Sequence, residues 1–355
     1  MKSPDKHNIS VIIPVYNGAA VLESCVRSVI SAGNRVAEII IVDDGSVDGT
    51  SEKADSLAIK DRRIQVIHTE NHGSYTARLT GIRAAASPYI AFCDADDRFF
   101  AGALDLLADL LETCDADTAF GGFVETEDLE TEDPAVKQPR KAEIYVRTQE
   151  ELWPRIMKWK TQEFFCYLWN KVYRKEVFSD LLEAEGLCQG DDVLLTCQAY
   201  LRVRKAVETT APVYLYWRNP GSLTRTAFGD RDLDLIAVWD TVVKIMEGKT
   251  AENRRQDLQY LAQYNRWRTD FTLICRLILA DSRESDRKYA AELKKWRKGL
   301  KAHWKELLRK RAMPHNRELL ILGLCFMYTP TRFFMRAGGR LIRWKKKSRQ
   351  KKTGC

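Results

Sequence analysis

The sequence predicts an α/β fold with a Rossmann-like, mostly parallel sheet flanked by helices, followed by a helical C-terminal extension. Strand-like apolar runs alternate with helical segments through the first hundred residues, and after about Asp230 the pattern becomes entirely helical. With 355 residues, 45% of them hydrophobic and 30% charged, the chain has the composition of a globular protein. Its length suits about two domains.

The first hundred residues contain four candidate strands with helices between them. The first strand is a β-branched run that ends at a Tyr-Asn-Gly turn, and the other three are likewise short and apolar, as in a buried parallel sheet. Short loops between strands and helices predict right-handed βαβ connections. In chain order we expect strand Ile9–Val15, helix Ala20–Ile30, strands Glu38–Val42 and Ile64–His68, helix Tyr75–Ala86 and strand Tyr89–Cys93.

Carboxylates follow two of these strands directly, at Asp43-Asp44 and at Asp94-Ala95-Asp96-Asp97. In extended backbone Asp94 and Asp96 would point to one side, where two unpaired carboxylates repel each other. A divalent cation such as Mg²⁺ or Mn²⁺ would relieve that repulsion. The alternative is a solvated turn, because Asp is a common turn residue.

Glycine-rich phosphate loops are missing from the sequence. No G-x-G-x-x-G follows the first strand, and no G-x-x-x-x-G-K-[ST] occurs. A sheet that holds a nucleotide without such a loop needs another way to neutralise phosphate. A metal ion on Asp96 would supply it.

Four motifs in order carry a resemblance to a known family: V-I-I-P-V-Y-N-G, E-I-I-I-V-D-D-G-S-V-D-G-T, N-H-G-S-Y-T-A-R-L-T-G-I and Y-I-A-F-C-D-A-D-D. Together they resemble the family 2 glycosyltransferases of the GT-A fold, of the bacterial surface-polysaccharide type. The resemblance covers residues 9 to 105 and continues more thinly through Trp169–Arg174, Gly190–Leu195 and Tyr214–Thr224.

The resemblance implies a nucleotide site and a metal ligand in the first half of the sheet. Asp96 would bind the metal that bridges the diphosphate. Asp43 would accept a hydrogen bond from the base or ribose, although a turn carboxylate is the alternative there, and a solvated helix face is the alternative for Arg78. The residues that would line the nucleotide are Pro14, Val15, Tyr16, Asp43, Arg78 and Asp94.

The acidic pair of the family, usually Glu-Asp, stands here as Asp191-Asp192. The resemblance implies that Asp192 is the catalytic base, which takes the proton of the acceptor hydroxyl. The departure at Asp191 leaves open which carboxylate acts. A structural alternative is that the pair caps a helix over Val193–Leu201.

The implied activity is inverting, metal-dependent transfer of a hexose or N-acetylhexosamine from a nucleoside-diphosphate sugar, which we expect to be a UDP-sugar. The acceptor would be a glycan or lipid-linked hydroxyl.

We expect the glycosyltransferase domain at 1–229, with a donor half at 1–120 and an acceptor half at 121–229, and a helical region at 230–355. The polar segment Glu125–Glu143 predicts an exposed loop between the halves. Core packing is expected for most of the aromatic residues that follow it: Trp153, Trp159, Phe164, Phe165, Tyr167 and Trp169.

The net charge of +8 is concentrated at the C-terminus. Ten Lys or Arg residues follow Glu318, the last acidic residue, so residues 1 to 318 carry a charge of −2. The helical stripe Tyr289–Leu307 precedes an apolar run, Leu319–Tyr328, that is too short for the roughly 20 residues a bilayer span requires. With Phe333, Phe334 and Trp344 nearby, this segment and the basic tail suggest an element lying in an anionic membrane interface. The alternative is a core helix with a solvated tail.

The nine cysteines are scattered, without a C-x-x-C pair, and M-K-S-P-D-K-H-N at the N-terminus has no apolar signal region. We therefore expect a cytoplasmic protein, peripheral at the inner face of the cell membrane.

Two alternatives from other classes are a nucleic-acid-binding protein acting through its basic tail and a nucleotidyltransferase on a similar sheet. The tail has no recognised reading motif, which makes nucleic acid the weaker partner.

Overall fold

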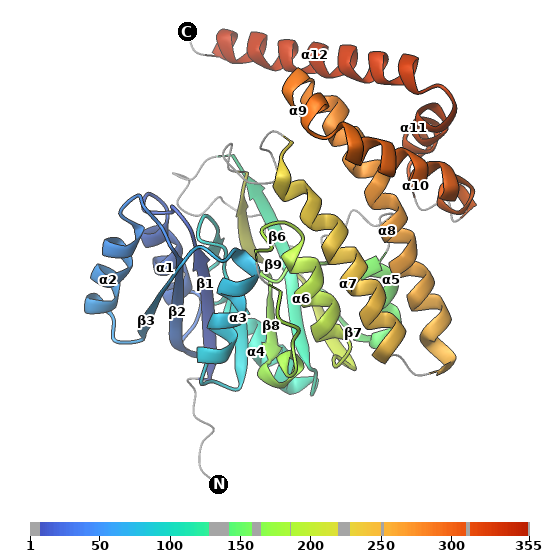
Figure 1. The fold of residues 1–355 in the computed structure, drawn as a ribbon. Coiled ribbons are helices and arrows are strands. Elements are labelled where there is room, and N and C mark those ends of the chain that lie inside the picture. The colour runs from blue at the N-terminus through green and yellow to red at the C-terminus, as the bar shows by residue number, and fades with distance from the viewer. Residues whose placement is uncertain are drawn as a thin grey trace. The chain divides into compact units, whose positions relative to one another are not determined.

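The computed structural model describes residues 8–127, 142–157, 165–184, 186–218, 228–249, 252–309 and 313–353 (Figure 1). Contacts divide the chain into two compact units. We call Met1–Ile156 with Phe164–Arg225 the sheet unit, and Met157–Glu163 with Thr226–Cys355 the helical unit.

The N-terminal half of the sheet is parallel. Its strands lie in the order β3-β2-β1-β4, and helices α1, α2 and α3 connect them in sequence. The four strands predicted from apolar runs are confirmed, with ends that differ by a few residues at most. The elements are β1 (Ile9–Val15), α1 (Leu22–Ser31), β2 (Val36–Asp44), α2 (Thr50–Lys60), β3 (Ile64–Thr69), α3 (Ser74–Ala84) and β4 (Tyr89–Phe92).

Beyond β4 the sheet becomes mixed. Strand β8 is antiparallel to β4 and β6, β6 is parallel to β9, and β5 and β7 are antiparallel to β9. The elements of this half are β5 (Arg98–Phe99), α4 (Ala103–Thr113), β6 (Thr118–Thr126), β7 (Ile144–Thr148), α5 (Gln149–Met157), β8 (Lys171–Arg174), α6 (Asp191–Tyr200) and β9 (Lys205–Trp217). Because β6 continues to Thr126, the predicted loop begins inside a strand, and its central part at 128–141 lies outside the described residues.

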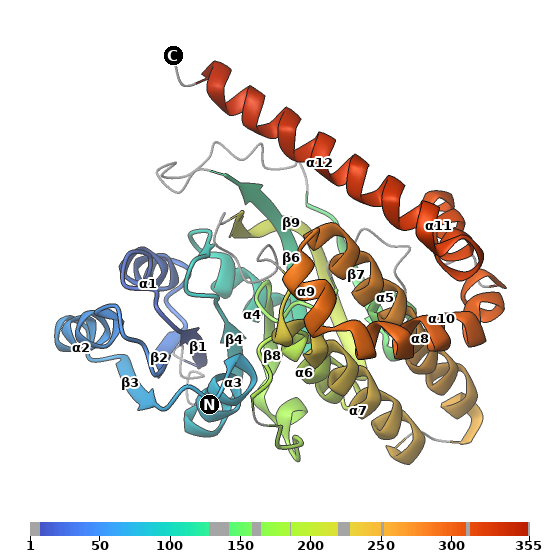
Figure 2. The same cartoon turned by 45° about the horizontal axis from the view of Figure 1, so that its top comes forward.

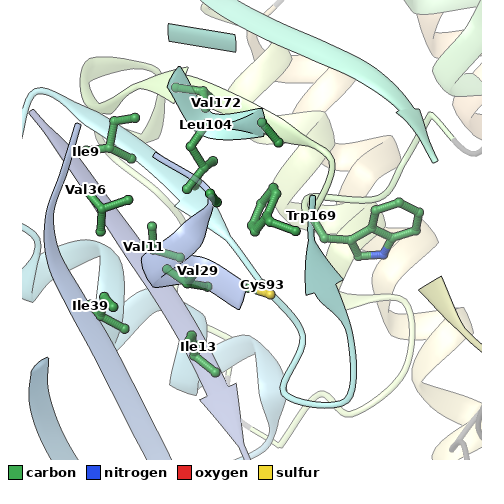
Figure 3. Packing of buried hydrophobic residues seen from close by; sticks show 14 of the residues in the cluster. Ile9, Val11, Ile13, Val29, Val36, Ile39, Cys93, Leu104, Trp169 and Val172 are labelled. Atoms are coloured by element: carbon green, nitrogen blue, oxygen red, sulfur yellow. The ribbon is translucent and has the colours of Figure 1, made fainter. Parts of the chain in front are cut away.

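Both faces of β1 and β4 are buried, as continuous apolar strands require. On one face Ile9, Val11 and Ile13 of β1 lie toward Val29 of α1 and Leu104 of α4 (Figure 3). Ile12 is also buried and lies toward the other face, against Gly81 of α3. A Cβ atom at Gly81 would overlap the Ile12 side chain, so the glycine allows α3 to approach β1 closely. This close packing fixes the helix that carries Arg78.

The aromatic residues that the structure describes after the predicted loop are mainly core residues. Trp153, Phe165 and Trp169 are buried, which confirms the prediction for these three, whereas Tyr167 is half-buried. Trp159 and Phe164 lie outside the described residues.

The helical unit confirms the all-helical prediction for the C-terminal region. The predicted stripe lies along α10, where Trp296, Leu300 and Leu307 are buried against α8 and α11. Figure 2 shows α12 as one long helix after α11. Of the helices in the described ranges, none has the length and hydropathy that a membrane crossing requires. The helices are α7 (Asp234–Lys249), α8 (Glu252–Ala280), α9 (Arg283–Lys288), α10 (Ala290–Arg309), α11 (His315–Phe326) and α12 (Tyr328–Thr353).

Candidate active site

The carboxyl ends of β1, β2 and β4 meet at one edge of the sheet. In the parallel register Val15 lies beside Asp43, and β4 neighbours β1 on its other side. The loop after β1 is bound to the loop after β2, because the Asn17 amide donates to Ser46 Oγ at 2.9 Å. Such an edge is where open α/β sheets bind ligands.

The three residues predicted to line the base differ in exposure. Val15 is buried and Pro14 is half-buried in the strand, whereas 46% of the Tyr16 surface is exposed. Of the three, Tyr16 therefore has the most open surface for a ligand ring.

Asp43 is buried and fully engaged by the protein. Its carboxylate accepts hydrogen bonds from the Ser46 amide at 3.1 Å, Ser51 Oγ at 2.5 Å and His68 Nδ1 at 3.0 Å. Burial alone would raise the pKa of Asp43, but these hydrogen bonds outweigh it and lower the pKa. In this structure the carboxylate organises the loop that follows β2.

Its neighbour Asp44 was given no role of its own from the sequence, yet it organises a loop in a similar way. The buried Asp44 carboxylate accepts from the backbone amides of His72 and Gly73, both at 2.9 Å. These bonds hold the loop that leads into α3. The second aspartate of the D-D-G-S motif was the sequence feature that could have indicated this role.

Arg78 joins two carboxylates from distant parts of the sheet unit. Its Nη2 donates to Asp94 Oδ1 at 2.8 Å, and its Nη1 donates to Asp191 Oδ2. The side chains of Arg78 and Asp191 are about nine-tenths buried. The alternative of a solvated helix face at Arg78 is therefore wrong, because its side chain is buried between these two carboxylates.

The residues after β4 form a tight turn and do not continue in extended backbone. The Asp97 amide donates to the Asp94 carbonyl at 2.9 Å, so the expectation of an extended Asp94–Asp96 pair is wrong. Asp94 and Asp96 are half-buried, whereas Asp97 is buried and accepts from the Trp217 amide at 2.8 Å. Burial raises the pKa of Asp97 well above its ordinary value, and the Asp94 and Asp96 carboxylates raise it further. Asp97 thus holds the turn to the end of β9.

Helix α6 begins at Asp191, two residues earlier than predicted, and its N-cap is Gly190. Neither aspartate occupies the N-cap position, and Asp191 bonds to Arg78. The capping alternative is therefore wrong for Asp191, although both charges still lie at the favourable end of the helix dipole.

Asp192 is half-buried in the first turn of α6. Its Oδ1 accepts from the Val193 amide at 2.8 Å. Burial raises the pKa of Asp192 to about 7, the Asp191 carboxylate adds to the rise, and Arg78 opposes it. A carboxylate with this pKa exchanges a proton readily near neutral pH, as a general base must.

An aromatic ladder lies beside these carboxylates. Tyr167 stacks on Trp169 with ring centres 4.8 Å apart, Trp169 stacks on Tyr214 at 4.6 Å, and Tyr214 Oη accepts from the Asp94 amide at 3.1 Å. Lys171, within the W-N-K-V-Y-R motif, is a buried residue that the sequence reasoning missed. It donates to the Tyr167 carbonyl at 2.6 Å, and burial lowers its pKa to about 7.

Known glycosyltransferases are similar to much of this chain. The family model described as glycosyl transferase family 2 matches residues 10–182. The glycosyltransferase GlyG of Streptococcus pneumoniae is 30% identical over 230 residues, which are 62% of this chain and 74% of GlyG. The chain belongs to glycosyl transferase family 2. The uncharacterized glycosyltransferase EpsJ of Bacillus subtilis is 31% identical over 62% of this chain, and the match spans 64% of EpsJ.

Solved structures show the same fold over nearly the whole chain. Residues 1–349 of TarS from S. aureus, in a crystal structure with UDP-GlcNAc, superpose with a TM-score of 0.64 and 16% identity. The superposition covers 94% of this chain and 92% of that one. This member of a glycosyltransferase family thus has the predicted GT-A fold and C-terminal helical extension.

The buried ion pair gives a testable prediction for stability. Arg78→Met leaves the Asp191 carboxylate buried without its partner, which should lower the free energy of unfolding by about 3–5 kcal/mol. Asp191→Leu in the same chain should restore part of the loss, because removing both charges costs less than removing one. Urea unfolding of the single and double variants measures this coupling. Strictly additive losses would contradict a direct interaction between the two side chains.

Proposed function

We propose that this glycosyltransferase moves a sugar from a nucleoside-diphosphate sugar, expected to be a UDP-sugar, to an acceptor hydroxyl with inversion at the anomeric carbon. The observation that carries the proposal is the Asp192 carboxylate, whose pKa is raised to about 7 in the first turn of α6. The adjacent Asp191 is bound through Arg78 to Asp94 at the end of β4.

In the proposed reaction the acceptor oxygen forms a bond to the anomeric carbon while the bond from that carbon to the diphosphate breaks. Asp192 takes the hydroxyl proton, and the bonding electrons leave with the diphosphate. A single displacement inverts the configuration and requires no covalent sugar intermediate. The positions of Asp94 and Asp191 on opposite arms of Arg78 support a fixed orientation for Asp192 during this step.

The donor is proposed to lie over the edge where β1, β2 and β4 end. The exposed Tyr16 ring is suited to contact the base, and Asp94 to bond the ribose. The TarS structure was solved with UDP-GlcNAc, which supports a UDP-sugar such as a hexose or N-acetylhexosamine donor. Asp43 would act mainly by holding the loop, because its oxygens already accept three protein hydrogen bonds.

The turn after β4 fits a divalent cation at Asp96. Carboxylate oxygens suit Mg²⁺ or Mn²⁺, which take their remaining ligands from phosphate and water. Within the described parts of the chain no three His, Cys, Asp or Glu side chains form a metal cluster, so phosphate oxygens of the donor and water would have to complete the ligands of a cation at Asp96. When bound, the cation would stabilise the charge of the departing diphosphate.

The expected role in cell-surface polysaccharide synthesis is part of the same proposal, with a glycan or lipid-linked acceptor. Membership of a glycosyltransferase family supports it over the nucleotidyltransferase and nucleic-acid-binding alternatives. Release of a nucleoside diphosphate, and no pyrophosphate, distinguishes the proposed reaction from nucleotidyl transfer.

We also propose that helices α11 and α12 bind an anionic membrane surface. Three arginines of the tail are not free, because Arg332 and Arg336 bond to Asp286, and Arg340 bonds to Asp281. With these arginines bound, Phe333 and Phe334 of α12 remain exposed. The large apolar residues exposed on the two helices and the turn between them are Leu319, Phe326, Met327, Phe333, Phe334, Leu341 and Ile342.

An exposed apolar surface next to a basic segment is typical of helices that lie in a membrane interface. Seven further Lys or Arg residues follow Ile342 without an acidic residue. Each contributes about 1 kcal/mol near an anionic surface. Membrane attachment would place the enzyme beside a lipid-linked or growing surface glycan.

The base assignment predicts distinct effects for the two neighbouring aspartates. Asp192→Asn should lower the transfer rate by about 10²–10⁴ while donor affinity changes little. Asp191→Asn should mainly lower stability, because Asp191 holds Arg78. Turnover, donor binding and thermal unfolding of both variants check this. A larger loss of turnover at position 191 than at 192 would overturn the assignment.

The same assignment predicts the direction of the pH dependence. Asp192 must be ionised to accept the proton, so transfer should rise about tenfold per pH unit below pH 7 and level off above it. A rate that is independent of pH between 5 and 8 would contradict a base with this pKa.

For the metal we predict that Asp96→Ala abolishes Mn²⁺-dependent transfer and leaves the fold intact, because Asp96 is half-buried in a surface turn. Turnover measured against Mn²⁺ concentration checks this, and Glu52→Ala on the exposed side of α2 is a matched control. Undiminished activity with an unchanged need for Mn²⁺ would refute the assignment.

Membrane attachment is tested by replacing Phe333 and Phe334 with Gln, which leaves Arg332, Arg336 and Arg340 in place. The double variant should lose most of its cosedimentation with phosphatidylserine vesicles, because it removes the exposed aromatic pair. A second variant that ends at Ile342 tests the seven basic residues separately. Undiminished cosedimentation of both variants would contradict the proposal.

A further inference from the structure

The helical unit contains a cavity of about 490 Å³ that the proposed transfer reaction does not use. Its volume is in the range of small-molecule binding sites. Helices α7, α8 and α10 contribute its walls, and the polar and aromatic side chains that line it include Asp240, Arg266, Trp267, Asp270, Lys295 and His303.

One wall of the cavity is aromatic. The rings of Trp267 and His303 stack nearly parallel, with centres 4.4 Å apart and an angle of 8° between their planes. Both residues are half-buried, so their side chains are packed on one side and still line the cavity. Burial lowers the pKa of His303, which keeps the imidazole neutral at physiological pH.

Another wall carries hydrogen-bonding groups of balanced charge. Arg266 lies between two carboxylates, with Nε 2.6 Å from Asp240 Oδ1 and Nη1 3.2 Å from Asp270 Oδ1. Lys295 supplies a second positive charge at the rim. The two cations and two carboxylates cancel, so the cavity favours neither an anionic nor a cationic ligand.

Two residues that line the cavity, Asp270 and Gly299, lower the stability of the helices that contain them. Asp270 is buried in the interior of α8, and burial raises its pKa to about 6. Gly299 lies inside α10, although glycine is a poor helix former. A Cβ atom at Gly299 would overlap Asp270 Oδ2, so the absence of a side chain at Gly299 leaves room for this carboxylate. Local costs of this kind are typical of functional sites.

We propose that this cavity binds a neutral sugar residue. A pyranose ring presents apolar C–H faces suited to an indole and hydroxyl groups suited to carboxylate and guanidinium, and it has no charge. The cavity would hold a part of a glycan in the helical unit, apart from the residues proposed for transfer. The inference concerns binding alone and does not depend on the donor or on the base assignment.

Saturation-transfer NMR with the full chain tests the proposal, using glucose, galactose, N-acetylglucosamine and their β-linked disaccharides as probes. We expect binding by at least one probe and a loss of about tenfold or more in Trp267→Ala, the factor that loss of an aromatic stack supports. Trp304→Ala is the matched control, because Trp304 follows His303 in α10, contacts Phe326 and does not line the cavity. It should bind the sugars as the unchanged chain does.

Gly299→Ala is a second variant that keeps both aromatic rings and displaces Asp270, and it should also weaken binding. Circular dichroism establishes that each variant is folded. Hydrolysis of a UDP-sugar by water should be unchanged in Trp267→Ala, which separates this cavity from the transfer site. Three results would overturn the proposal. They are absence of binding by every probe, binding by both cavity variants equal to that of the unchanged chain, and tighter binding of glucuronate or glucosamine than of glucose.

Discussion

The buried ion pair between Arg78 and Asp191 is the interaction on which the active-site arrangement depends. It joins residues 113 positions apart, and a second bond from Arg78 reaches Asp94 at the end of β4. A guanidinium suits this role because its donors lie in a rigid plane and can bond two carboxylates at once. The pair therefore sets the position of the first turn of α6 relative to the sheet edge, and with it the position of Asp192.

The parallel half of the sheet could be predicted closely because its strands are rich in apolar residues, and β1 and β4 are buried on both faces. The roles of its carboxylates could not be predicted equally well. Asp94 and Asp96 were considered in extended backbone, with a turn as the alternative, and the Asp97 amide closes a turn onto the Asp94 carbonyl. For Asp191 the sequence left a catalytic role and helix capping open, and its partner was unknown because that partner lies in α3. Tertiary contacts decide such roles, and local sequence does not record them.

The tail of the helical unit illustrates the same limit. Sequence alone counts Arg332, Arg336 and Arg340 as free positive charge, whereas the structure uses them to fix α12 to Asp281 and Asp286. Their spacing of four residues places them on one side of the helix. With that side occupied, the large apolar residues of α12 are left exposed. The ion pairs thus orient the helix, and the surface available to a membrane follows from them.

Burial near the active site has a consequence for stability as well as for catalysis. The pKa of Asp192 is raised in the folded state, so the folded protein holds this proton more tightly than the unfolded chain does. Stability from this group is present at low pH and is lost as the pH rises from the unfolded value of about 4 to about 7, by about 1.4 kcal/mol for each unit of pKa difference. Arg78 opposes this loss because its charge stabilises the ionised carboxylate. The buried cation therefore has two effects that cannot be separated: it orients the acidic pair, and it limits what an ionisable base costs the fold at neutral pH.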